Sequence, residues 1–119
     1  MPKLVKIVNG VVVREYPLEG KEITIGRAAK HPIQLDDSTV SSLHARLQIL
    51  PSAYLEGFND VWLEDKNSTN GTLINGRRIT RERLKHGDVI GIGAHKLEFI
   101  DEANLGTETT RLLLNDTRD

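Results

Sequence analysis

A serine and a histidine lie three residues apart in the segment Ser41-Ser42-Leu43-His44, and such a pair could serve catalysis. A serine hydroxyl becomes a nucleophile when a neighbouring histidine removes its proton. However, no Gly-x-Ser-x-Gly elbow is present, and no segment supplies an oxyanion hole for Ser41. We therefore assign no catalytic residue and interpret His44 as a structural histidine that hydrogen-bonds the loop backbone. The serine hydroxyls are then available to bind an anion or to cap a turn.

Two further polar segments could bind an anion or a peptide. Gly26 lets the backbone turn sharply at a strand end, and the planar guanidinium of Arg27 beside it suits a phosphate or a carboxylate. The alternative is an exposed arginine on a solvated loop. Residues 65–70 are all polar, and the Asn70 amide can both donate to and accept from a peptide backbone. The alternative for this segment is an ordinary turn.

The composition of the 119-residue chain excludes several classes of protein. Without cysteine it has no disulfide framework, thiol nucleophile or cysteine-ligated metal, and we expect no metal or cofactor. The chain has 16 basic and 17 acidic residues, so it lacks the basic excess that is typical of nucleic-acid binders. No apolar run approaches the ~20 residues that cross a bilayer, and the N-terminus lacks a signal-peptide core. We expect one cytoplasmic domain that binds neither nucleic acid nor a membrane.

Short apolar runs separated by turn residues predict β-strands along residues 1–101. Asn9-Gly10 and Asn75-Gly76 predict tight hairpins, because both residue types tolerate positive φ. The best helical candidate in this part of the chain is 80–85, barely one turn. Aromatic residues make up only 4% of the chain, so the core must consist mainly of Val, Ile and Leu. Roughly nine to eleven short strands with closely spaced turns are typical of a β-sandwich or barrel.

Taken in order, the polar segments resemble the motifs of the forkhead-associated (FHA) domain family. The ordered set has nearly the family's spacing: Gly26-Arg27, Ser41-x-x-His44, 67–71 and Asn75-Gly76. The resemblance covers about residues 3–100. It implies an all-β fold, an FHA-type β-sandwich of about eleven short, mainly antiparallel strands. We therefore expect an FHA domain at 1–101 and a flexible C-terminal tail at 102–119.

The resemblance implies a phosphothreonine-dependent interaction module in Ser/Thr kinase signalling, and not an enzyme. FHA domains bind phosphopeptides through loops at one end of the sandwich. By motif position, Arg27 pairs with the phosphate, Ser41 hydrogen-bonds it, and Ser42 contacts it directly or supports that contact. Thr69 lines the pocket around the phosphothreonine, and Asn70 holds the peptide main chain. The remaining motif residues are implied to shape the loops and a hairpin: Gly26, His44, Asn75 and Gly76.

The implied partners are phosphothreonine-containing proteins and a Ser/Thr protein kinase. The alternative is an FHA-fold interaction or scaffold protein that binds partners without phosphate. Three departures from the family pattern concern peptide preference. Ser42-Leu43 stands where members often carry a larger polar or basic residue, Pro32 removes a backbone N–H, and 51–60 is a longer, more apolar connection.

Three threonines in the C-terminal segment are candidate phosphorylation sites: Thr107, Thr109 and Thr110. Each lies next to or near an acidic residue, outside the predicted sandwich. A phosphorylated threonine here would be a ligand for the domain itself, within one chain or between copies, and would compete with outside partners. The alternative is a solvated tail in which these threonines are incidental.

Overall fold

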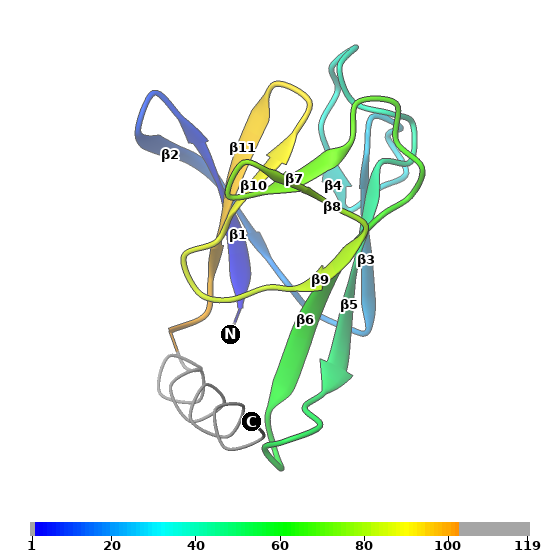
Figure 1. Ribbon diagram of the computed structural model, residues 1–119. Helices are drawn as coiled ribbons and strands as arrows, with labels where there is room; N and C mark the ends of the chain where they lie inside the picture. The colour runs from blue at the N-terminus through cyan, green and yellow to red at the C-terminus, as the bar shows by residue number, and fades with distance from the viewer. Residues whose placement is uncertain (1, 103–119) are drawn as a thin grey trace.

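The computed structural model describes residues 2–102, which form a β-sandwich of eleven short strands (Figure 1). The all-β fold predicted from the sequence is confirmed. The strands are β1 (Lys3–Val8), β2 (Val11–Pro17), β3 (Glu22–Gly26), β4 (Ile33–Gln34), β5 (Ala45–Pro51), β6 (Asn59–Asp65), β7 (Thr72–Ile74), β8 (Arg77–Ile79), β9 (Arg81–Arg83), β10 (Val89–Ile92) and β11 (His95–Ile100).

The strands form two sheets that face each other (Figure 1). The six-stranded sheet has the order β2-β1-β11-β10-β7-β8, and the five-stranded sheet has the order β4-β3-β5-β6-β9. Only β3 and β4 pair in parallel, in the short register Ile25↔Ile33. The other strand pairs are antiparallel, so neighbouring loops gather at the two ends of the sandwich.

Both predicted hairpins are present. Asn9 (φ 52°) and Gly10 (φ 79°) connect β1 to β2, while Asn75 (φ 51°) and Gly76 (φ 81°) connect β7 to β8. Two consecutive residues at positive φ are the geometry of the type I′ turn, whose twist matches that of paired strands. The Asn-Gly pairs therefore set the register of both hairpins.

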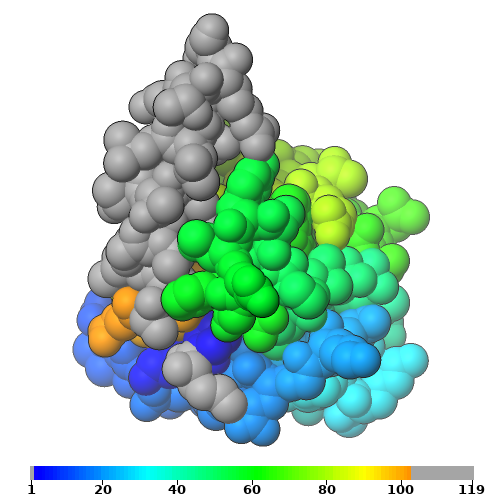
Figure 2. Space-filling model, turned by 90° about the horizontal axis from the view of Figure 1, so that it is seen from below, coloured from blue at the N-terminus to red at the C-terminus, as the bar shows by residue number. Residues whose placement is uncertain are grey.

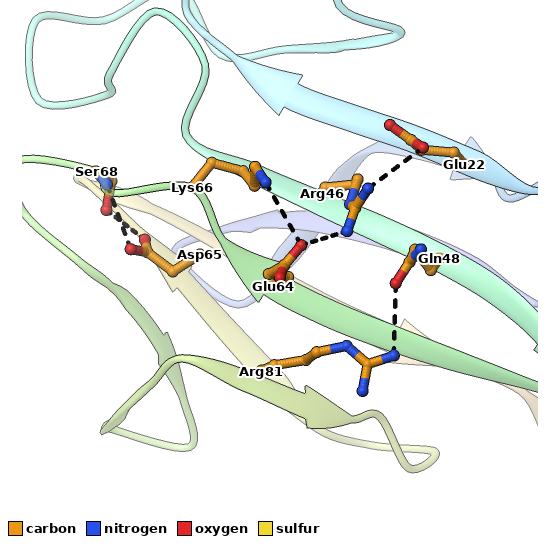
Figure 3. A network of polar contacts seen from close by, with 8 residues as sticks. All are labelled: Glu22, Arg46, Gln48, Glu64, Asp65, Lys66, Ser68 and Arg81. Atoms are coloured by element: carbon orange, nitrogen blue, oxygen red, sulfur yellow. Dashed lines mark hydrogen bonds and ion pairs between the residues drawn. The ribbon is translucent and has the colours of Figure 1, made fainter.

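The core between the sheets consists mainly of Val, Ile and Leu, as the composition predicted. Alternation along β5 shows how it is built: Ala45 and Leu47 are fully buried, whereas Arg46 and Gln48 lie on the outer face. Phe99 and Tyr16 are the aromatic members of the core. Figure 3 shows the polar outer face, where Arg46 pairs with Glu22 and Glu64.

The helical candidate 80–85 is wrong, because residues 81–83 form strand β9. Its register against β6 is Trp62↔Arg83 and Glu64↔Arg81. The Arg81 guanidinium lies 4.3 Å from the centroid of the Trp62 ring, a cation–π contact across the two strands. Pairing with β6 and this stacking outweigh a local preference that amounts to one helical turn.

The segment beyond residue 102 lies outside the described residues, and with it the predicted tail and its threonines Thr107, Thr109 and Thr110. Within residues 2–102, no helix is long and apolar enough to cross a membrane. The same residues contain no group of three or more His, Asp or Glu side chains placed to hold a metal ion.

Candidate functional site

Three loops meet at one end of the sandwich, drawn at the top of Figure 1. They are 27–32 after β3, 35–44 before β5, and 66–71 between β6 and β7. Between them lies a pocket of about 250 Å³. It brings together all five residues predicted to contact a phosphopeptide, with three neighbours; the lining residues are Arg27, Ser38, Thr39, Val40, Ser41, Ser42, Thr69 and Asn70.

Arg27 is presented to this pocket by a backbone that is held on both sides. Its N–H donates to the Ser41 carbonyl (3.0 Å), and its own carbonyl accepts from the Gln34 side chain (3.1 Å). The residue is exposed, and within residues 2–102 its guanidinium forms no ion pair. A planar cation with five N–H donors is therefore available to an anionic ligand.

Ser41 links the loop before β5 to the two other loops. Its carbonyl accepts from Arg27, and its Oγ accepts from the Thr69 N–H at 3.0 Å. A hydroxyl that accepts one hydrogen bond still has its own proton to donate. Ser41 can therefore donate to a ligand oxygen beside Arg27.

His44 is fully buried and joins two loops through their backbones. Nδ1 accepts from the Ser41 N–H (3.0 Å), so the ring proton is on Nε2, which donates to the Gly71 carbonyl (2.9 Å). Both ring nitrogens are engaged, and their partners are backbone groups. In this arrangement His44 is not placed to remove a proton from the Ser41 hydroxyl.

Asn70 and Thr69 lie on the exposed rim of the pocket. Asn70 Nδ2 donates to the Thr39 carbonyl at 2.9 Å, which orients the side-chain amide. Within residues 2–102 its Oδ1 and its second N–H make no other hydrogen bond, so both can bond the main chain of a peptide. The Thr69 N–H is bonded to Ser41, so Thr69 offers the pocket its side chain.

Asp65, at the end of β6, closes the loop that carries Thr69 and Asn70. Its carboxylate accepts from the hydroxyls of Ser68 and Thr72, and the Ser68 hydroxyl accepts from the Gly71 N–H (2.9 Å). The Asp65–Ser68 contacts are drawn in Figure 3. Burial raises the pKa of Asp65, but the hydrogen bonds from Ser68 and Thr72 outweigh burial and hold that pKa below its ordinary value of 3.8.

Gly26 shapes the site for a reason that differs from the prediction. It is not among the positive-φ residues, so it makes no turn that requires glycine. Instead, a Cβ at Gly26 would lie 2.2 Å from the Ser42 carbonyl oxygen and 2.7 Å from Cδ2 of the His31 ring. Glycine is needed because the backbone of the loop 35–44 approaches β3 too closely for any side chain.

Asn75 and Gly76 form the β7–β8 hairpin and do not line the pocket. The Asn75 side chain donates to Asp88 Oδ1 (3.0 Å) and accepts from the Val89 N–H (2.9 Å). These bonds attach the hairpin to the start of β10. The motif residue therefore supports the six-stranded sheet at a distance from the pocket.

Three pocket residues were not among the five predicted to contact the phosphopeptide: Ser38, Thr39 and Val40. The loop that carries them is held by Asp37, whose carboxylate accepts from the Thr39 hydroxyl and N–H and lies 3.3 Å from His95 Nε2. The Thr39 bonds, with a smaller effect of His95, lower the pKa of Asp37. The Asp37-x-Thr39 spacing is typical of a side-chain-closed turn and could have indicated a fixed loop.

The connection 51–60 lies at the end of the molecule opposite the pocket and does not line it, and its effect on peptide preference stays a prediction. In the β5–β6 register, Ala45↔Asp65 marks the pocket end and Pro51↔Asn59 marks the far end. Figure 2 views the molecule from that far end, where this connection is drawn in green. By contrast, Ser42, another departure from the family pattern, does line the pocket.

Comparison with known proteins gives a consistent result. The family model of the FHA domain matches residues 23–93. The glycogen accumulation regulator GarA of Mycolicibacterium smegmatis is 33% identical over an alignment of 97 residues, which covers 76% of this chain and 57% of that protein. The chain covers less than two thirds of the length of the curated relatives that it matches, from 8% to 64%.

Solved structures extend the similarity to three dimensions. A structure from a study of phosphothreonine-dependent FHA domain interactions has a TM-score of 0.70 and 29% identity, covering 84% of this chain and 95% of that one. EmbR of Mycobacterium tuberculosis, solved with a low-affinity phosphopeptide, has a TM-score of 0.70 and 30% identity, covering 83% of this chain and 24% of that one. The two-sheet architecture is thus that of the matched structures.

Proposed function

The chain belongs to the FHA domain family, and on that premise we propose that it is a phosphothreonine-dependent protein interaction module. One observation carries the proposal. The guanidinium of Arg27, unpaired within residues 2–102, shares a pocket with the hydroxyl residues Ser41, Ser42 and Thr69. This set of donors suits a compact anion carried on a peptide.

The chemistry of phosphothreonine fits these donors. At neutral pH its phosphate carries a charge of about −1.5 to −2 and offers three acceptor oxygens. Arg27 can form two parallel charge-assisted bonds, and the Ser41 hydroxyl can donate a third. Val40, a core residue that also lines the pocket, is the apolar side chain that we propose for contact with the threonine methyl. Burying that methyl favours threonine over serine by ~0.8 kcal/mol, about fourfold in affinity.

The arrangement of Ser41 and His44 favours a binding role for the pocket over a catalytic one. A serine nucleophile needs a base that can reach its hydroxyl. His44 instead bonds the Ser41 and Gly71 backbones. The role that we propose for Ser41 is to donate a hydrogen bond to the phosphate. Asn70, on the rim, would hold the peptide main chain through its amide.

The proposal is tested by calorimetry on the full chain. The ligand is a phosphothreonine peptide selected from an oriented library, compared with the same peptide after phosphatase treatment. Arg27→Ala should lower affinity at least about 30-fold, since removing one partner of a desolvated charge pair costs ~2–5 kcal/mol. Arg14→Ala is the matched control, because Arg14 is exposed on β2, outside the pocket.

Three outcomes separate the candidate functions. Loss of binding on dephosphorylation and on Arg27→Ala, with Arg14→Ala unchanged, supports the proposal. Equal binding of the dephosphorylated peptide would favour a phosphate-independent interaction protein. Turnover of a phosphoryl or acyl substrate that Ser41→Ala abolishes would favour an enzyme.

We propose phosphothreonine-containing proteins and the Ser/Thr kinase that modifies them as the partners. Such kinases use ATP, and we therefore propose the cytoplasm as the compartment in which they meet. We also propose that residues 1–101 are the binding domain and 102–119 a separate tail segment.

The tail threonines Thr107, Thr109 and Thr110 are proposed phosphorylation sites and ligands for the same pocket. The test is to phosphorylate the full chain and an Arg27→Ala variant, then to measure molar mass by light scattering over a concentration series. Association of the wild type alone, or its weakened binding of an outside phosphopeptide, supports self-recognition. A monomeric phosphoprotein with unchanged peptide affinity contradicts it.

A further inference from the structure

His31 is a buried polar residue, only 6% exposed, that no motif assigned. Its ring lies directly against Gly26, at the end of β3, because a Cβ there would be 2.7 Å from His31 Cδ2. Pro32 follows it and restricts the His31 backbone to extended conformations. The ring is thus packed in one place between β3 and the loop before β5.

Both ring nitrogens of His31 have partners on different elements. Nδ1 lies 2.8 Å from the Thr24 hydroxyl on β3, and Nε2 lies 2.7 Å from the Ser42 carbonyl. A carbonyl only accepts, so Nε2 carries a proton and donates. The ring therefore connects β3 to the backbone of a pocket residue.

The Ser42 carbonyl also accepts from the Ala28 N–H at 3.3 Å, and the neighbouring Ser41 carbonyl accepts from the Arg27 N–H at 3.0 Å. These two backbone bonds join the loop 27–32, which bears Arg27 (the arginine-bearing loop), to the loop 35–44, which bears Ser41 and Ser42 (the serine-bearing loop). The shorter bond from His31 reaches the same Ser42 oxygen. If the His31 bond were lost, the Ser42 carbonyl would keep only the longer bond from the Ala28 N–H.

We propose that His31 is a positioning residue for phosphate binding, which holds Arg27 and Ser42 at a fixed separation by bonding the Ser42 carbonyl. His31 does not line the pocket, so it acts through its neighbours. The loops are thereby ordered before the ligand binds, so the entropic cost of ordering them does not weaken binding. This inference rests on the proposed function of the pocket.

The test compares three full-chain variants. His31→Leu fills the space of the ring with an apolar side chain and removes both ring hydrogen bonds. His31→Gln keeps a side-chain N–H donor for the Ser42 carbonyl. Val61→Ala is the control, a core truncation on β6 that lines no part of the pocket. Affinity for the library-selected phosphothreonine peptide is measured by calorimetry, below the unfolding transition of each variant.

One ordinary hydrogen bond corresponds to about tenfold in an equilibrium constant. His31→Leu should therefore weaken peptide binding about tenfold, and His31→Gln should restore most of that loss. Val61→Ala should lower the melting temperature and leave affinity unchanged, because a folded molecule still has its pocket. If His31→Leu bound the peptide as tightly as the wild type, the positioning role would be wrong.

A ligand-free measurement separates this inference from the function it rests on. The amide protons of Arg27 and Ala28 donate across the loop junction, so their hydrogen exchange reports its opening. Exchange at both should accelerate in His31→Leu and not in His31→Gln or Val61→Ala. Unaccelerated exchange in His31→Leu overturns the inference even if the wild type binds phosphopeptides. Accelerated exchange in a protein that binds none overturns the proposed function alone.

Discussion

Replacing Gly26 by alanine is the most direct perturbation of the contact between β3 and the serine-bearing loop. The new Cβ would lie 2.2 Å from the Ser42 carbonyl oxygen and 2.7–2.9 Å from the His31 ring. Ordinary van der Waals contact begins at 3.4 Å. The loop backbone must therefore retreat by about 1.2 Å, the difference between those two distances, because a backbone oxygen cannot rotate away as a side chain can.

The size of the effect follows from the bonds that this retreat would stretch. They are Arg27 N–H to Ser41 O, Ala28 N–H to Ser42 O, and His31 Nε2 to Ser42 O. Each contributes about 0.5–1.5 kcal/mol net, and overpacking costs typically ~1–3 kcal/mol. Allowing for partial relaxation, Gly26→Ala should lower the free energy of unfolding by about 2–4 kcal/mol. Phosphopeptide affinity should fall about tenfold or more, because the two halves of the pocket move apart.

Urea unfolding and phosphopeptide calorimetry measure the two effects, and Gly20→Ala is the matched control. Gly20 has φ +87°, and a Cβ at this position would have no neighbouring atom within 4 Å. Alanine there is strained only by its backbone conformation, by about 1–2 kcal/mol. The control should leave peptide affinity unchanged. The steric reasoning is refuted if Gly26→Ala costs less than Gly20→Ala, or if it binds the peptide as tightly as the wild type.

Three other substitutions give distinct outcomes. Asn70→Ala should weaken all phosphothreonine peptides by a similar factor, about tenfold, because main-chain contacts do not depend on peptide sequence; a changed ranking in a peptide array would contradict this. Asp65→Asn should destabilise the protein at neutral pH. Because the folded-state pKa of Asp65 is lowered, its stabilisation is present above the ordinary value of 3.8 and is lost as pH falls through the folded pKa. The difference from wild type in urea unfolding should therefore shrink below about pH 4, and a constant difference would argue against an ionised Asp65. Asn75→Ala should cost about 2–3 kcal/mol, through strain at φ 51° and the lost side-chain bonds to Asp88 and to the Val89 N–H, with unchanged peptide affinity in calorimetry.

Local patterns in the sequence predicted most of the fold. Alternation such as Ala45-Arg46-Leu47 places every second side chain in the core, and the Asn-Gly pairs adopt the positive φ that a tight hairpin needs. Both signals depend only on a residue and its near neighbours in the chain. Strand β9 (Arg81–Arg83) was missed because three residues carry too little periodicity. Its conformation is decided by pairing with β6 and by the Arg81–Trp62 contact.

The sequence predicted which residues form the candidate site, but only part of the physical reason why each one is there. Arg27, Ser41 and Asn70 could be named from motif order, and they line one pocket. Val40 was not named as a contact, because a valine is an ordinary strand residue and only the meeting of the loops places it in the pocket lining. The far-end position of 51–60 also followed only from the β5–β6 register.

The sequence by itself determined the all-β class of fold, the turns and the identity of the polar donors, since backbone preference and side-chain chemistry are properties of single residues and short segments. Only the tertiary structure explains why position 26 requires glycine and why His31 is buried. Both depend on the Ser42 carbonyl oxygen, which lies 2.7 Å from His31 Nε2 although the two residues are eleven positions apart in the chain. A contact of that kind exists only once β3 and β5 have paired and brought their loops together.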